Sequence, residues 1–406
     1  MTSVSQKFAQ RFPALTFKPF RLFWLAQIVS LTGTWMQNLA LPWLVYQLTG
    51  SPFLLGLTGT LQFLPQMFLS PFAGTVADHF PKRTMVLITQ TVMTLTSALL
   101  GVLSFLHLVS YPLILILALI TGLANTLDQP VRQGLVAEIV GRDNLLNAVA
   151  LNSAAFNGAR IFGPAVAGVV MALWGVAWCF TLNALSFLPA IAALSLVPRS
   201  LRPRLPLSVR QLLHSTREGL AYVVHRRDLR DVLIAVTLMG VLAFNFSILL
   251  PVLVKQTFAL GETAFGTLLS AMGLGSLAAA VLLAFTSRRG PDRRLLAWAP
   301  MLAGAALVGL GLSHNFTLTF VLMVVIGFAN IAFFTTANSH LQGTSDDAFR
   351  SRVISLYTLA FGGMTPLGNF FVGTLAQFQG AAFTFAVTGL LLLVSFGALR
   401  VWEGRQ

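Results

Sequence analysis

Charged residues and cysteine are both scarce in this sequence. Asp, Glu, Lys and Arg make up only 9% of the 406 residues, whereas soluble domains carry about 25%. Cys179 is the only cysteine, which excludes an intrachain disulfide and a cysteine metal cluster. The chain is instead 56% hydrophobic, with a mean hydropathy of +0.80. This composition is that of a protein that crosses a membrane many times.

Sequence motifs of phosphate-binding and catalytic sites are also missing. No Walker-type phosphate loop occurs, so ATP is not expected as the energy source. Neither a nucleophile with its base nor metal-ligand spacing is present, so we expect no enzyme, no metal and no cofactor. An ion gradient remains as the energy source. The proton is the simpler choice, because nothing in the sequence indicates the carbonyl-rich broken helix of a sodium site.

Long apolar runs predict twelve membrane-spanning helices, since each crossing needs about 20 residues. The runs lie at roughly 21–48, 52–78, 84–107, 111–138, 144–171, 176–197, 231–256, 262–287, 295–313, 317–341, 351–378 and 381–401. An even number of crossings places both termini on the same side. The predicted fold class is an all-α polytopic membrane protein.

Basic residues identify that side. Of all the Lys and Arg residues, only Arg160 and Lys255 lie away from the connections on the side of the termini. The positive-inside rule therefore places both termini in the cytoplasm, with the chain in the cell inner membrane. The same rule accounts for the net charge of +14, so no nucleic-acid partner is needed.

One connection, at 198–230, is long and rich in Arg and Pro. It predicts three parts: an N-terminal six-helix bundle (1–197), a cytoplasmic basic linker (198–230) and a C-terminal six-helix bundle (231–406). Part of the linker has the pattern of an amphipathic helix that lies on the lipids of the inner leaflet. The two bundles are expected to be related, because Gly-Leu-Ala-Asn at 122–125 recurs as Gly-Phe-Ala-Asn at 327–330.

The connection between the second and third spans has the pattern G-x-x-x-D-x-x-x-K-R, formed by Gly74, Asp78, Lys82 and Arg83. With the twelve predicted spans and the basic linker, it resembles the major facilitator superfamily over essentially the whole chain. His79 departs from the base that usually follows the Asp in that family. The resemblance implies alternating access between two six-helix bundles.

The same resemblance implies a cytoplasmic gate. Gly74 would allow close packing of the second span on the eleventh, and Asp78 would face the start of the eleventh span. Arg350 and Arg352 lie there and would supply cations to a carboxylate at a helix end. Lys82 and Arg83 complete the predicted gate.

Small residues in the fifth span resemble the glycine and proline signature of antiporting drug exporters; they are Gly158, Gly163, Pro164 and Gly168. Helix packing is the structural alternative for them. Residues 125–133 and 350–357 are most similar to the branch that contains enterobactin exporters and macrolide efflux pumps. The resemblance implies a monomeric, proton-coupled exporter of a small amphiphilic molecule such as a siderophore or a drug. The alternatives are a lipid or lysolipid flippase of the same fold and a membrane receptor that transports nothing.

Ionisable residues inside membrane spans are costly and mark candidate sites. Asp128 lies 17 residues after Tyr111, hence roughly 25 Å below the outer face, and Arg132 follows on the same helix face. Arg160 lies near the middle of the fifth span. We expect Asp128 to exchange a proton, with Arg132 or Arg160 stabilising its carboxylate in one state. The alternative is a fixed inner gate that Asp128, Arg132 and Glu138 form with Asp78 and Arg83.

Aromatic and amide residues of the first, fourth, seventh and tenth spans are candidates for the substrate cavity. Such a lining suits a large, flat or amphiphilic solute that is oriented by hydrogen bonds. Packing is the alternative for any single aromatic residue. The candidates are Trp35, Gln37, Asn38, Asn125, Phe244, Asn245 and Asn330.

Overall fold

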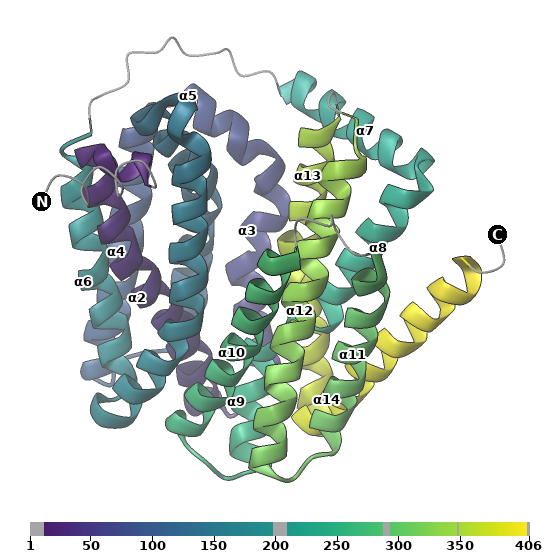
Figure 1. The fold of residues 1–406 in the computed structure, drawn as a ribbon. Helices are drawn as coiled ribbons and strands as arrows, with labels where there is room; N and C mark the ends of the chain where they lie inside the picture. Colours follow the sequence, from purple (N-terminus) through teal and green to yellow (C-terminus); the bar gives the residue numbers. More distant parts are fainter. Residues whose placement is uncertain (1–11, 198–208, 287–292, 347–348, 404–406) are drawn as a thin grey trace, which may run out of the picture. The chain divides into compact units, whose positions relative to one another are not determined.

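The computed structural model describes residues 12–197, 209–286, 293–346 and 349–403, whose regular structure is helical (Figure 1). Within these ranges, the side chains of 71–79, 209–216, 399–403 and several single positions lie outside the described part. The elements are η1 (Pro13–Thr16), α2 (Lys18–Thr49), α3 (Pro52–His79), α4 (Lys82–Phe105), α5 (Tyr111–Trp174), α6 (Val176–Leu194), α7 (Val209–His225), α8 (Arg227–Leu242), α9 (Phe246–Gln256), α10 (Glu262–Thr286), α11 (Arg293–Leu312), α12 (Phe316–Thr344), α13 (Arg350–Thr358), the π-helical turn η3 (Leu359–Gly363) and α14 (Thr365–Glu403).

Helix α5 contains two of the predicted spans, and α14 contains the last predicted span together with the second half of the span before it. Helix α5 is kinked at Gly141, where φ is +72°, and α14 is kinked at Gly380, where φ is +80°. Glycine adopts this left-handed conformation without a steric penalty. A single glycine therefore reverses the chain where the sequence predicted a short connection.

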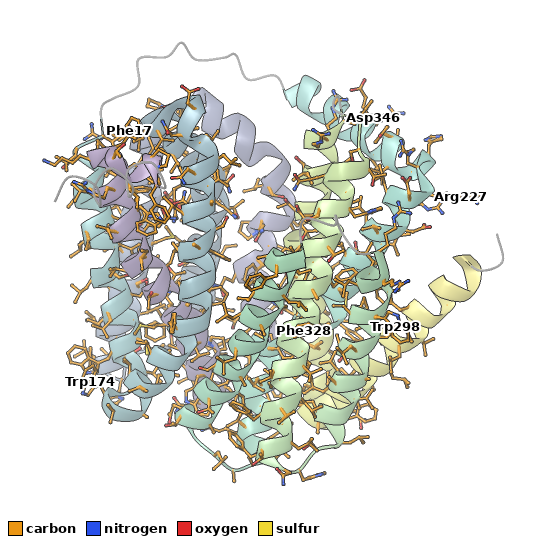
Figure 2. The ribbon with its side chains drawn as sticks, in the orientation of Figure 1. Phe17, Trp174, Arg227, Trp298, Phe328 and Asp346 are labelled. Carbon is orange, nitrogen blue, oxygen red and sulfur yellow. The ribbon has the colours of Figure 1, made fainter. Side chains whose placement is uncertain are left out.

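Eight helical stretches of the described residues are long and apolar enough to cross a membrane. Large apolar side chains are exposed on the helices, as in Trp174 of α5 and Trp298 of α11, which are 60% and 61% exposed (Figure 2). An apolar surface of this extent requires lipid rather than water. The stretches are Lys82–Phe105, Tyr111–Gly141, Val176–Leu194, Arg227–Gln256, Glu262–Phe285, Arg293–Leu312, Phe316–Thr344 and Arg352–Ala398. The fold class is therefore confirmed, and twelve crossings remain the predicted number.

The chain divides into two compact units. Unit 1 contains Met1–Ala40 and Phe72–Ser208, and unit 2 contains Leu41–Pro71 and Val209–Gln406. The division at 197 and 231 that the sequence predicted stays a prediction. In the structure, residues 41–71 belong to the same compact unit as the helices of the C-terminal half. In unit 1, α4 packs against α5 and α6. In unit 2, α10 packs against α12, and α11 packs against α14.

Residues 41–71 contact the rest of unit 2 through small residues and through one buried ring. A Cβ atom at Gly373 of α14 would lie 2.7 Å from the Cα of Gly56, so the two backbones touch. Trp43 is 1% exposed and stacks on Phe265 with ring centroids 5.5 Å apart. Its indole nitrogen donates a hydrogen bond to Oε1 of Glu262 over 2.9 Å. Glu262 thus satisfies the polar atom of a buried ring.

Replacement of Glu262 by alanine is expected to lower the free energy of unfolding by about 1–3 kcal/mol, because the indole N–H of Trp43 then loses its acceptor. Glu262→Gln is the matched control, since it keeps a carbonyl oxygen in reach of Trp43. Thermal unfolding of the purified protein in detergent measures both variants. Equal melting temperatures for the two variants would show that the hydrogen bond contributes nothing.

Candidate functional site

Asp128 is the most deeply buried charged residue of the described chain, with 1% of its surface exposed. Its Oδ1 accepts hydrogen bonds from Oγ1 of Thr89 over 2.7 Å and from Nε2 of Gln90 over 3.4 Å. Its Oδ2 pairs with Nη2 of Arg132, one helical turn further along α5. A carboxylate removed from water is tolerated only when it is paired and hydrogen-bonded in this way. The structure therefore brings Asp128 and Arg132 together, as the spacing predicted.

A second ion pair lies further along α5. Nζ of Lys82 is 2.9 Å from Oε1 of Glu138, and the two side chains are 18% and 15% exposed. Lys82 passes close to the backbone of α5, since a Cβ atom at Gly134 would lie 2.6 Å from Cε of the lysine. Nη2 of Arg83 donates to the backbone oxygen of Ser195 over 3.5 Å. Lys82 and Arg83 of the predicted gate thus contact α5 and the C-cap residue of α6, respectively, within unit 1.

Several predicted site residues cannot be placed by their side chains. Asp78, Arg160 and Pro164 have side chains outside the described part of the chain, and nothing is described of the surroundings of Gly74. The expected contact between Asp78 and the start of the eleventh span therefore stays a prediction.

At the start of that span, Nη1 of Arg352 lies 3.2 Å from Oε2 of Glu218, a residue of α7. Nε of Arg350 donates to the backbone oxygen of Gln342 over 3.0 Å. Sequence reasoning did not foresee Glu218, because no spacing along the chain relates a linker residue to the start of α13.

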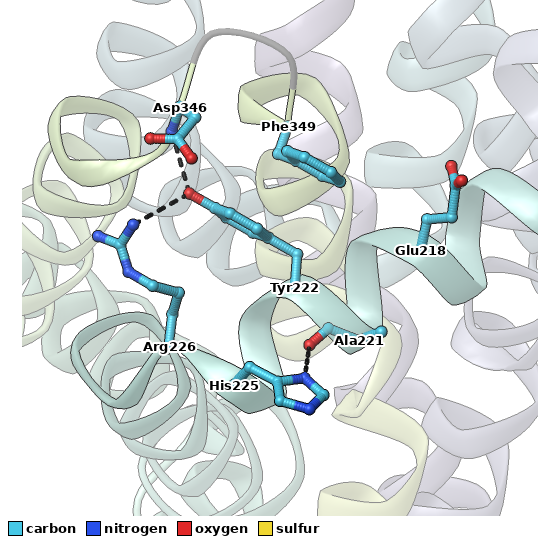
Figure 3. Close-up of a pocket in the computed structure, with 7 residues that line it drawn as sticks. All are labelled: Glu218, Ala221, Tyr222, His225, Arg226, Asp346 and Phe349. Atoms are coloured by element: carbon cyan, nitrogen blue, oxygen red, sulfur yellow. Dashed lines mark hydrogen bonds between the residues drawn. The ribbon is translucent and has the colours of Figure 1, made fainter.

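Helix α7 is fixed to the rest of unit 2 by aromatic and polar contacts (Figure 3). The ring of Tyr222 stacks on Phe349, with centroids 4.3 Å apart and planes 2° from parallel. Its hydroxyl oxygen accepts hydrogen bonds from Nη1 of Arg226 over 3.4 Å and from the backbone nitrogen of Asp346 over 3.1 Å. Arg226 also pairs with Asp228, which raises the pKa of the arginine above its ordinary value. These contacts hold the linker helix against the end of α12.

A shallow groove of about 560 Å³ lies beside this contact, lined by Glu218, Ala221, Tyr222, His225, Arg226, Asp346 and Phe349 (Figure 3). On α7 itself, Val223 is buried, whereas Leu220 and Val224 are 52% and 50% exposed. The helix thus has apolar side chains on two sides. Its predicted contact with the inner leaflet stays a prediction, for which Leu220 and Val224 are the available residues.

In unit 1, a buried polar network surrounds Gln37. Its Oε1 accepts hydrogen bonds from Oγ of Ser97 over 2.6 Å and from Nδ2 of Asn183 over 2.7 Å. Asn38 and Asn125 line the same small cavity of about 10 Å³, which is room for about one water molecule. The structure therefore brings three predicted cavity residues together. The sequence signal for Ser97 and Asn183 was available, because both are polar residues within apolar runs.

The remaining residues of unit 1 that were predicted as sites lie in packing contacts or open space. The ring of Trp35 meets Phe156 edge to face at 5.9 Å. A Cβ atom at Gly163 would lie 2.5 Å from Cβ of Trp35, whereas one at Gly158 would meet nothing within 4 Å. Gly168 is buried. In this structure Trp35 and Gly163 therefore pack against each other.

In unit 2, the predicted seventh span is broken. Residues 243–245 are not helical and separate α8 from α9. Nδ2 of Asn245 donates to the backbone oxygen of Val241, and Nδ2 of Asn330 donates to that of Ala243 over 3.4 Å. The side-chain amides thus donate hydrogen bonds to backbone carbonyl oxygens, which in a continuous helix would accept from backbone N–H groups. The predicted span at 231–256 is present as the apolar stretch Arg227–Gln256, with a break at 243–245 that the apolar run did not indicate. The sequence therefore contained no sign of a broken helix, whereas the structure has one here.

Aromatic rings lie next to this break. Phe244 meets Phe361 edge to face at 5.3 Å and Phe334 at 6.1 Å, and Phe334 meets Phe361 at 4.5 Å. Phe334 follows Asn330 by one turn of α12, and Phe361 belongs to the turn η3. Phe244, Asn245 and Asn330, all predicted as cavity residues, therefore lie together.

Comparison with known proteins gives a consistent result. Residues 9–403 match the major facilitator family described as transmembrane secretion effector. The chain is 25% identical to the staphyloferrin A transporter of Staphylococcus aureus, over 91% of this chain and 92% of that one. It is 26% identical to the multidrug efflux pump Tap of Mycolicibacterium fortuitum, over 93% of each chain.

It is also 25% identical to the enterobactin exporter EntS of Shigella flexneri, over 95% of this chain and 93% of that one. Among solved structures, a point mutant of the nucleoside transporter NupG superposes with a TM-score of 0.73 at 15% identity, over 94% of this chain and 99% of that one. At that identity the likeness concerns the fold alone.

Proposed function

Because this chain belongs to the transmembrane secretion effector family of the major facilitator superfamily, we propose that it is a proton-coupled exporter of a small amphiphilic molecule. The transporter class follows from the family. Export is supported by the relatives named as efflux pump and exporter. A siderophore or a drug is the substrate class that those names favour. None of the relatives named above is described as a lipid flippase, so no observation favours that alternative.

The observation that carries proton coupling is the environment of Asp128. Thr89 and Arg132 stabilise its carboxylate in this structure. The side chain of Arg132 is 17% exposed and that of Asp128 is 1% exposed, so Arg132 is the partner that can turn toward water. Its departure leaves a carboxylate in a dry site, where protonation becomes favourable. An alternating-access cycle that moves Arg132 would therefore load and release one proton.

Transport into inverted membrane vesicles with an acidic lumen tests this function. A catecholate siderophore, a macrolide and ethidium serve as probes. We expect the pH gradient to drive accumulation of at least one of them, and a protonophore to abolish that accumulation. Accumulation that is unchanged by the protonophore would exclude proton coupling. Movement of fluorescent phospholipid between leaflets, without accumulation of any probe, would favour a flippase instead.

A further inference from the structure

The break between α8 and α9 holds two buried amide oxygens that accept no hydrogen bond from the described residues. They are Oδ1 of Asn245 and Oδ1 of Asn330. The two residues are 3% and 4% exposed. A buried acceptor without a donor costs about 1–3 kcal/mol. Two such atoms lie at one break, so both are available to accept hydrogen bonds from a bound molecule.

The orientation of both amides is fixed by their nitrogens. Nδ2 of Asn245 faces the oxygen of Val241, and Nδ2 of Asn330 faces the oxygen of Ala243. Rotation of either amide would place two oxygens against each other. Asn245 is also the N-cap residue of α9, yet its side chain accepts no capping hydrogen bond. The free acceptors are therefore a consequence of the break itself.

The chemistry at the break favours a neutral donor over a cation. Helix α9 has 11 residues and begins at Phe246, so its N-terminus contributes a partial positive charge beside Asn245. Among the described His, Cys, Asp and Glu residues, no group of three could hold a metal ion. A hydroxyl or amide N–H group satisfies an amide oxygen without adding charge near the helix N-terminus.

The ligand that brings such donors must also fit aromatic walls. Phe244, Phe334 and Phe361 form an edge-to-face cluster beside the two amides. Helix α8 approaches this cluster closely, since a Cβ atom at Gly240 would lie 3.1 Å from the backbone oxygen of Phe361. Phe361 lies in a π-helical turn, a distortion that occurs frequently at functional sites.

We propose that the break between α8 and α9 is a substrate subsite for planar aromatic groups bearing neutral O–H or N–H donors. Oδ1 of Asn245 and Oδ1 of Asn330 accept from the donors, and the three phenylalanines contact the ring. This subsite rests on the proposed transport function and narrows its substrate to compounds with phenol-like or amide-bearing rings.

Two probes of the same shape test this subsite. They are 2,3-dihydroxynaphthalene, which has two neutral donors, and 2,3-dimethoxynaphthalene, which has none. Binding is measured by equilibrium dialysis of the purified full-length protein in detergent, against detergent alone to correct for partition into micelles. We expect the dihydroxy compound to bind about tenfold more tightly, which corresponds to one or two hydrogen bonds.

The variant Asn330→Leu is expected to reduce that preference to about one. Thr319→Val is the matched control, because it also removes a buried polar group from α12, away from the break. It should keep the preference. The probe pair on the unaltered protein decides the question even if Asn330→Leu does not fold.

Three results would overturn the subsite. They are equal binding of the two probes to the unaltered protein, no binding of either, and a preference that survives in Asn330→Leu. Stabilisation of the unaltered protein by sodium chloride but not by choline chloride, lost in Asn330→Leu, would assign the oxygens to a cation instead. The measurement uses no gradient, so its failure is separate from a failure of proton coupling.

Discussion

The variant Asp128→Asn is expected to lose gradient-driven export entirely, so that probe accumulation falls to the level measured without a pH gradient. Asparagine keeps the shape of the side chain and an acceptor for Thr89 but cannot take up a proton. Vesicle transport with an acidic lumen gives the measurement. Downhill movement of the probe should remain, because the substrate path itself is unaltered.

The same variant is expected to lower the free energy of unfolding by about 3–5 kcal/mol, because Arg132 then lacks the partner of a buried ion pair. The double variant Asp128→Asn, Arg132→Gln removes both charges and should recover most of that stability. It should not recover coupling. A double variant that is stable and still driven by the gradient would show that the pair is only structural.

Glu138→Gln is the matched control for this experiment. It removes a carboxylate from the same helix and breaks the 2.9 Å ion pair with Lys82. The side chain of Glu138 is 15% exposed, whereas that of Asp128 is 1% exposed, so its carboxylate is less enclosed than that of Asp128. We expect coupling to persist in this variant. Equal loss in Glu138→Gln and Asp128→Asn would favour a fixed inner gate made of both pairs.

Helix positions were predictable because a membrane span is specified by a local property, the length of an apolar run. The pairing of Asp128 with Arg132 was predictable for a similar reason, since the i, i+4 spacing places both side chains on the same face of one helix. Both depend on residues that are close in sequence. The sequence predicted a short loop near Gly141 and near Gly380. The structure instead has a single glycine with positive φ at each place.

Partners far apart in sequence could not be predicted in this way. The contact of Arg352 with Glu218 joins residues of α13 and α7, and no pattern in either segment specifies the other. The break at 243–245 depends in part on Asn330, which donates from another helix to the oxygen of Ala243. A polar residue within an apolar run identified Asn245 and Asn330 as candidates. Which hydrogen bonds they form depends on how the helices pack.

Helices α10 and α12 pack so closely that their backbones are in contact. A Cβ atom at Gly327 would collide with the backbone oxygen of Met272, and one at Gly275 would collide with that of Val324. Oγ of Ser276 also donates to the backbone oxygen of Gly327 over 3.2 Å. Small residues let two helices approach to backbone contact, which is a main source of helix association in membranes. Glycine is therefore required at position 327 because the backbone of α10 leaves no room for a side chain.

Gly327→Ala is expected to lower the free energy of unfolding by about 1–3 kcal/mol, the usual cost of overpacking, and Gly327→Leu should prevent the protein from folding. The obstacle is backbone on both sides, so no side chain can rotate away to make room. Gly343→Ala is the control on the same helix, because a Cβ atom there meets nothing within 4 Å, and alanine is the better helix former. Thermal unfolding and size-exclusion profiles of the detergent-purified variants measure the difference. If Gly327→Ala melts at the same temperature as Gly343→Ala, the two helices are not held in backbone contact.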